Sequence, residues 1–146
     1  MARVLGNKLD RKFAYIDGKP NDVEAVRLAF QRLVDSGVSY RKVAQNKGLV
    51  INTVRYYFKG LRDVDGATID FMGKLLSYTD KSETETRKLK ESLKKVLKEN
   101  TSRGLARKTG ATQQNIVLYM NGSLTIGQMT LGFAERLLYG DREKEE

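Results

Sequence analysis

The chain has 146 residues and a formal net charge of +9, and 40% of its residues are hydrophobic. This length allows one average domain or two small ones with a buried core. Cysteine and histidine are absent, which excludes disulfides, thiol or imidazole catalysis and the common zinc sites. No apolar run could span a membrane and no secretory signal is evident, so we expect a cytoplasmic protein.

Residues 1–21 are predicted to form a basic amino-terminal arm. Lysine and arginine outnumber aspartate there, and Asp17-Gly18 is a turn signal. We expect a short extended segment or a loop that packs on the structure following it.

The first helical domain is predicted to span residues 22–76 and to contain about four helices. Its first helix starts at Asn21 or Asp22, which can cap it, and ends near Gly37. After a loop over residues 61–67, Thr68 is expected to cap the fourth helix.

Residues 38–60 have the pattern of a helix-turn-helix. Ser39 can cap a short helix, and Gly48 permits the sharp turn that ends it. Val54, Tyr57 and Phe58 recur at helical spacing, which predicts the buried face of a second helix. Two short helices joined by a glycine turn are typical of the DNA-binding motif whose second helix enters the major groove.

The same pattern recurs 62 positions later without a gap. The matched pairs include Ser39 with Thr101, Ala44 with Ala106, Gly48 with Gly110, Val54 with Ile116, Tyr57 with Tyr119, and Thr68 with Thr130. The chain is therefore predicted to be all-α, a tandem duplication of two helix-turn-helix domains. A polar linker is expected at residues 77–83, the second domain at 84–139 and a charged tail at 140–146.

Basic residues gather in both motifs. Residues 38–62 and 100–134 contain lysine and arginine but no aspartate or glutamate. A charge distribution of this kind favours a polyanionic partner, here double-stranded DNA, although basic residues can also simply solvate a helix face. The basic arm could likewise follow phosphates or enter the minor groove, or make no DNA contact. The high lysine, arginine and glutamate content is also typical of a thermophile.

The start of the second helix in such a motif points at base edges. Amide side chains there can pair with adenine, and an apolar side chain can meet a thymine methyl group. The predicted base-reading residues are Gln113, Gln114, Asn115 and Val117 in the second domain, and Ile51, Asn52, Thr53, Arg55 and Tyr56 in the first. Phosphate contacts are expected from Tyr40, Arg41, Lys42, Lys59, Arg103, Arg107 and Thr112. The alternative for all of these residues is an ordinary polar helix surface.

The two motifs resemble the helix-turn-helix domains of phage repressors over nearly the whole chain. Their tandem arrangement, the small size and the basic charge resemble the archaeal CRISPR repeat-binding proteins, although members of that family can carry three units where this chain has two. The resemblance implies binding to CRISPR repeat DNA and modulation of transcription through the array, without catalysis or cofactor. Because one chain carries two reading helices, we expect it to bind as a monomer.

Other functions are compatible with the same motifs. A conventional repressor or regulator of promoters would share the fold and differ only in its target. A protein-interaction adaptor could use the helix-turn-helix as a scaffold. An RNA-binding protein is less favoured, because the exposed aromatic sheet pattern of single-strand readers is missing. An enzyme is least favoured, since acidic pairs such as Asp63 and Asp65 have no supporting base, metal ligands or small-molecule site.

Overall fold

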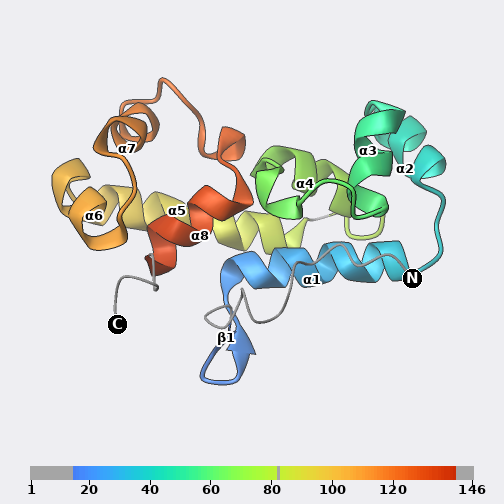
Figure 1. Ribbon diagram of the computed structural model, residues 1–146, viewed down its shortest axis with the longest axis horizontal. Helices are drawn as coiled ribbons and strands as arrows, with labels where there is room; N and C mark the ends of the chain where they lie inside the picture. The colour runs from blue at the N-terminus through green and yellow to red at the C-terminus, as the bar shows by residue number, and fades with distance from the viewer. Residues whose placement is uncertain (1–14, 82, 141–146) are drawn as a thin grey trace.

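The computed structural model describes residues 15–81 and 83–140 (Figure 1). Apart from one two-stranded hairpin the regular elements are helices, which confirms the all-α class. Most of the predicted arm and all but the first residue of the predicted tail lie outside the described residues. Within the described ranges, no helix is both long and apolar enough to cross a membrane.

A repeated order of elements follows the hairpin. The hairpin pairs β1 (Tyr15–Ile16) with β2 (Lys19–Pro20) in antiparallel register. The first half then contains α1 (Asp22–Asp35), α2 (Tyr40–Lys47), α3 (Ile51–Phe58), the 3₁₀-helix η2 (Val64–Gly66) and α4 (Ile69–Leu76). The second half contains α5 (Thr84–Glu99), α6 (Ser102–Thr109), α7 (Gln113–Met120), the 3₁₀-helix η3 (Ile126–Gln128) and α8 (Leu131–Tyr139).

Side-chain caps set several of these helix starts, as predicted. The Asn21 side chain accepts from the Glu24 N–H at 2.7 Å and so begins α1. Thr68 and Thr130 accept from the N–H groups three residues later at 3.1 and 3.3 Å. The sequence prediction was wrong about residues 61–67, which are not all loop: η2 occupies Val64–Gly66, and Asp63 caps it. Val64 of η2 and Gly127 of η3 are buried, so both 3₁₀-helices pack against the core.

The buried side chains of both halves form one continuous hydrophobic core. Phe30 of α1 and Leu93 of α5 are fully buried in it, and α1 packs along α5. Helix α4 also packs on α5, and α8 packs on η2 of the other half. The residues predicted as a linker therefore connect two halves that are already in contact.

The halves meet at an antiparallel bridge between Thr68 and Thr130, which are equivalent residues of the repeat. Two backbone hydrogen bonds flank it, from the Ile69 N–H to the Met129 carbonyl at 2.9 Å and from the Leu131 N–H to the Ala67 carbonyl at 3.0 Å. These bonds also exchange equivalent residues, because 67 and 69 correspond to 129 and 131.

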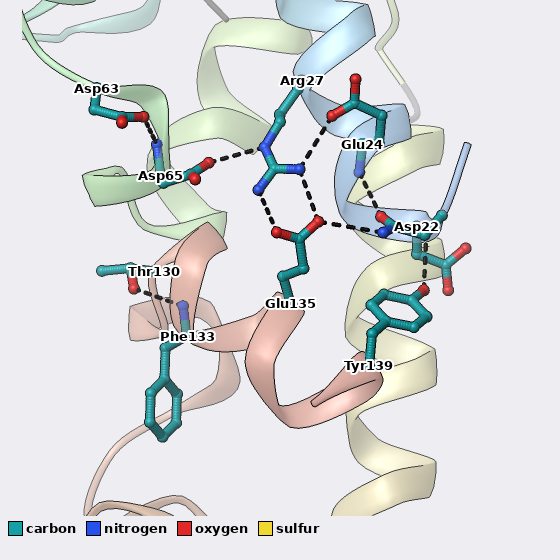
Figure 2. Close-up of polar contacts among 10 residues, drawn as sticks. Asp22, Glu24, Arg27, Asp63, Asp65, Thr130, Phe133, Glu135 and Tyr139 are labelled. Atoms are coloured by element: carbon teal, nitrogen blue, oxygen red, sulfur yellow. Dashed lines mark hydrogen bonds and ion pairs between the residues drawn. The ribbon is translucent and has the colours of Figure 1, made fainter. Parts of the chain in front are cut away.

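A buried arginine forms the second set of contacts between the halves (Figure 2). The Arg27 side chain is 0% exposed, and its guanidinium donates to Asp65 at 2.8 Å and to Glu24 at 3.0 Å. It also bonds both carboxylate oxygens of Glu135 on α8, at 2.7 and 2.8 Å. Burial alone would lower the pKa of Arg27, but the bond with Glu135 and the charge of Asp65 outweigh burial and raise that pKa. The arginine is thus held charged between the two halves.

Further polar contacts extend this contact region. The Lys90 ammonium on α5 lies 2.7 Å from the Asp70 carboxylate on α4. The Asp22 N–H at the start of α1 donates to the Tyr139 hydroxyl at 3.0 Å, and Ser92 donates to the Asp22 carboxylate at 2.6 Å. Burial raises the pKa of Tyr139, so this hydroxyl stays protonated. Each half therefore bonds to the other through both its first and its fourth helix.

Candidate nucleic-acid interface

Each half presents a pair of short helices joined by a tight turn, α2 with α3 and α6 with α7. We call these the first and the second helix pair. Helix α2 ends at Gly48, whose φ of 66° lies in the left-handed region, and the Gly48 N–H bonds back to Ala44. Gly110 ends α6 in the same way, with φ of 78° and a bond to Ala106. A β-carbon at Gly48 would meet nothing within 4 Å, so its backbone angle and not crowding calls for glycine.

The second helix of each pair buries one face against the core. Val54 and Ile116 are fully buried at equivalent positions. Tyr57 packs against Phe71 with ring centroids 5.4 Å apart, and Tyr119 packs against Phe133 at 5.7 Å. The two tyrosines therefore hold the second helix onto the fourth helix of their own half. Their packing leaves the opposite face of α3 and α7 toward solvent.

In the first pair, the predicted site residues differ in exposure. Asn52 on α3 is exposed, while Thr53, Arg55 and Tyr56 are half-buried. Ile51 packs partly against the hydrophobic core, so less of its side chain can reach a ligand. From its place at the start of the second helix of the motif, the sequence predicted a base-reading role for Ile51, but its side chain is half-buried against the core. The predicted phosphate contacts Arg41, Lys42 and Lys59 are all exposed, and Tyr40 is half-buried.

Cations and aromatic rings interleave on the first pair. The Arg41 guanidinium and the Lys59 ammonium each lie 5.9 Å from the centre of the Tyr40 ring. The Arg62 guanidinium lies 5.2 Å from the Tyr56 ring. Contacts of this kind contribute about 0.5–1 kcal/mol each at exposed sites, and they limit how the long side chains move. Arg62 was not predicted as a site residue, although its place in the acid-free stretch was a usable signal.

In the second pair, the predicted site residues share an exposed surface. On α7 the exposed residues are Gln113, Gln114, Asn115, Val117 and Leu118, and around it Arg103, Arg107 and Thr112 are exposed as well. The Gln113 amide donates to the Ser102 hydroxyl at 3.3 Å, which links the start of α7 to the start of α6. Thr112 stands at the N-cap of α7 without a side-chain capping bond. Its hydroxyl is therefore not used to start the helix.

The two pairs differ in chemistry at equivalent positions. Arg55 and Tyr56 of α3 correspond to Val117 and Leu118 of α7, and both α7 residues are 37% exposed. Leu118 was not among the predicted base-reading residues. Around the helices, Lys59 and Arg62 correspond to Asn121 and Leu124. The first pair thus presents cations and aromatic rings, with exposed Val50 and Leu61 flanking α3, and the second presents amides beside Val117 and Leu118.

Comparison of the chain with protein-family models, curated proteins and solved structures finds no match. The proposed function therefore rests on the residues and their geometry alone.

Proposed function

We propose that the chain binds double-stranded DNA sequence-specifically through two helix-turn-helix domains, residues 22–76 and 84–139. In this proposal α3 and α7 are unlike recognition helices that enter the major groove. The observation that carries the proposal is the same combination in both halves. In each helix pair the first helix ends at a glycine with left-handed backbone angles, and one face of the second helix is exposed. Each pair also lies in a stretch of sequence without aspartate or glutamate.

The exposed side chains suit the two kinds of DNA contact. Asn52, Gln113 and Gln114 carry amides that can bond adenine in the major groove, and Val117 can contact a thymine methyl group. Arg55 is the candidate for guanine. The cations around the helices would hold phosphates, which fixes the register of the protein on the duplex without reading sequence. Their number is greater around the first pair, so that half would supply more of the affinity.

The salt dependence of binding tests the electrostatic part of this proposal. Five cations are assigned to phosphates: Arg41, Lys42, Lys59, Arg103 and Arg107. Displacing counterions at five phosphates gives a slope of about −4.5 for log affinity against log salt, or a loss of roughly 500-fold between about 50 and 200 mM. Fluorescence anisotropy with a labelled duplex measures this slope. A slope near zero would contradict the proposed phosphate contacts.

The target follows from the sequence resemblance, and CRISPR repeats are the first to test. We propose that the chain coats such repeats and modulates transcription through the array. Crosslinking and sequencing of the DNA bound in cells should be dominated by array repeats. Enrichment at promoters instead would assign the chain to conventional transcription regulators. Coverage without any enriched sequence would contradict specific binding altogether.

A second candidate function is favoured by one specific observation. Val117 and Leu118 are neighbouring apolar residues on α7, each 37% exposed, and exposed apolar side chains can belong to a protein interface. In this alternative the second helix pair docks a protein. Replacing both residues with serine separates the two functions. Loss of discrimination among duplexes supports base contact, whereas unchanged DNA binding favours the adaptor.

A further inference from the structure

The contacts between the halves have the pattern of a local twofold axis. At the bridge between Thr68 and Thr130, the flanking residues exchange backbone bonds reciprocally, so residue 69 donates to 129 and residue 131 donates to 67. A relation by translation alone would not place equivalent residues opposite each other in antiparallel fashion. The axis therefore passes between the two threonines.

Contacts farther from the bridge follow the same axis. The first helix of each half forms an ion pair with the fourth helix of the other, Arg27 with Glu135 and Lys90 with Asp70. Two close contacts of glycines are also related by this axis. A β-carbon on Gly127 would overlap the Asp70 carboxylate, and one on Gly132 would lie 3.4 Å from Asp65. Positions 65 and 127 are equivalent in the repeat, as are 70 and 132, so these two contacts are related by the twofold.

The arrangement of the reading helices agrees with this axis. In Figure 1, α3 and α7 lie toward opposite ends of the long axis of the molecule. Both lie on the same side of the layer formed by α1 and α5, whereas the β1–β2 hairpin lies on the other. The two helices therefore lie on one side of the molecule, at a distance from each other along its length.

This orientation determines how two half-sites must run along DNA. B-DNA has its own twofold axes perpendicular to the helix axis, and operator symmetry mirrors protein symmetry. Two recognition helices related by a twofold meet the duplex in opposite directions and read opposite strands. Two helices related by translation would instead read half-sites that repeat in the same direction.

We propose that one chain reads two half-sites that differ in sequence and run in opposite directions, as an inverted arrangement of fixed spacing. This inference rests on the proposed DNA binding and adds the orientation and spacing of its target. The half-sites differ because Asn52, Arg55 and Tyr56 stand where the other half has Gln114, Val117 and Leu118. The spacing is fixed because Arg27 and the backbone bridge join the halves across a continuous core.

The decisive test makes the two reading helices alike. The reading residues of α7 are grafted onto α3, with Ile51 left in place because it packs on the core. The graft consists of Asn52→Gln, Thr53→Asn, Arg55→Val and Tyr56→Leu. Duplexes with a long random centre are then selected by the wild-type chain and by the grafted chain. The grafted chain should select a palindrome, in which one half-site appears twice in opposite directions.

The outcomes of this test distinguish a wrong orientation of the half-sites from a wrong assignment of DNA binding. A direct repeat selected by the grafted chain overturns the inverted arrangement while leaving DNA binding intact. Failure of the wild-type chain to enrich any sequence refutes the proposed function itself. If the graft disturbs folding, which circular dichroism reports, the reciprocal graft on α7 repeats the test. That variant carries Gln114→Asn, Asn115→Thr, Val117→Arg and Leu118→Tyr.

A second measurement tests the fixed spacing with unmodified protein. Five base pairs inserted at the centre of the selected site turn one half-site to the far side of the duplex. Affinity should fall at least about tenfold, toward that of a duplex with one half-site scrambled, since even one mismatched pair costs on that order. Unchanged affinity after the insertion would show that the halves move independently, and would overturn the fixed spacing.

Discussion

At the scale of single residues, the proposed DNA binding gives two kinds of side chain on the helix pairs separable roles. Gln114 is exposed at the start of α7, where an amide can bond a base edge. Arg103 is exposed near the start of α6, where a guanidinium can hold a phosphate. In the proposed complex, the Gln114 contact would depend on the base sequence, whereas the Arg103 contact would not.

We therefore expect Gln114→Ala to reduce discrimination at one or two base pairs by about 1–3 kcal/mol. Arg103→Ala should weaken binding to all duplexes about equally and lower the magnitude of the salt slope by about one. Binding titrations against single-base variants of the selected site measure both effects. If the two substitutions weaken all duplexes alike, Gln114 does not read bases.

Arg27 has a different role, because it holds the halves together. Replacing it with leucine would leave the carboxylates of Glu24, Asp65 and Glu135 facing one another without their shared partner. Removing one member of a buried ion pair costs about 3–5 kcal/mol. We expect Arg27→Leu to lower the free energy of unfolding by that amount in urea titrations followed by circular dichroism.

The matched control is on the same helix. Arg32 is 68% exposed on α1, and its guanidinium lies 3.9 Å from the Glu85 carboxylate. Because exposed ion pairs contribute little, Arg32→Leu should change the free energy of unfolding by no more than about 0.5 kcal/mol. Similar small losses in both variants would mean that the buried network does not stabilise the halves.

At the scale of the elements, local chemistry predicts the helices well. Asn21, Ser39 and Thr68 begin helices as their side chains suggest, and Gly37 and Gly48 follow or end helices with positive φ. The repeat of 62 residues also predicted the order of the second half. These features depend on neighbours a few residues apart, so the sequence alone is enough to locate them.

Long-range contacts could not be predicted in the same way. Arginine is usually exposed, and two of the three carboxylate partners of Arg27 lie 38 and 108 residues away. The orientation of the halves depends on backbone bonds at Thr68 and Thr130, which leave no side-chain pattern. For the same reason the prediction did not separate exposed Asn52 from half-buried Ile51, Thr53, Arg55 and Tyr56, and it omitted exposed Leu118. A helical period gives the face of a residue, but the neighbouring elements determine how much of that face is covered.

The turn inside the first helix pair offers a test at this scale. Gly48→Ala places a β-carbon at a left-handed φ of 66°, which costs about 1–2 kcal/mol. Gly66→Ala is the control, because it has no positive φ and its added β-carbon meets nothing within 4 Å. Thermal unfolding should show a clear loss for the first variant and little change or a small gain for the second. Equal losses would contradict the backbone explanation.

At the scale of the whole molecule, the proposed DNA complex needs only one chain. The two proposed recognition helices, α3 and α7, belong to one polypeptide, and the halves share one core. Light scattering of the purified complex with its selected duplex should give a mass of one chain per site at all protein concentrations. A strict requirement for two chains per site would contradict binding as a monomer.

The bridge at Thr68 and Thr130 has a consequence for how such a protein can change. In a symmetric homodimer, every mutation occurs in both subunits and so alters both DNA-reading surfaces at once. Here the two equivalent surfaces are encoded separately, so a change at Gln114 leaves Asn52 untouched. If each half reads its own half-site, as proposed, each can change its DNA preference by single mutations, while the backbone bonds between the halves keep their relative geometry. The chain has the twofold arrangement of a dimer, but the two equivalent surfaces can mutate independently.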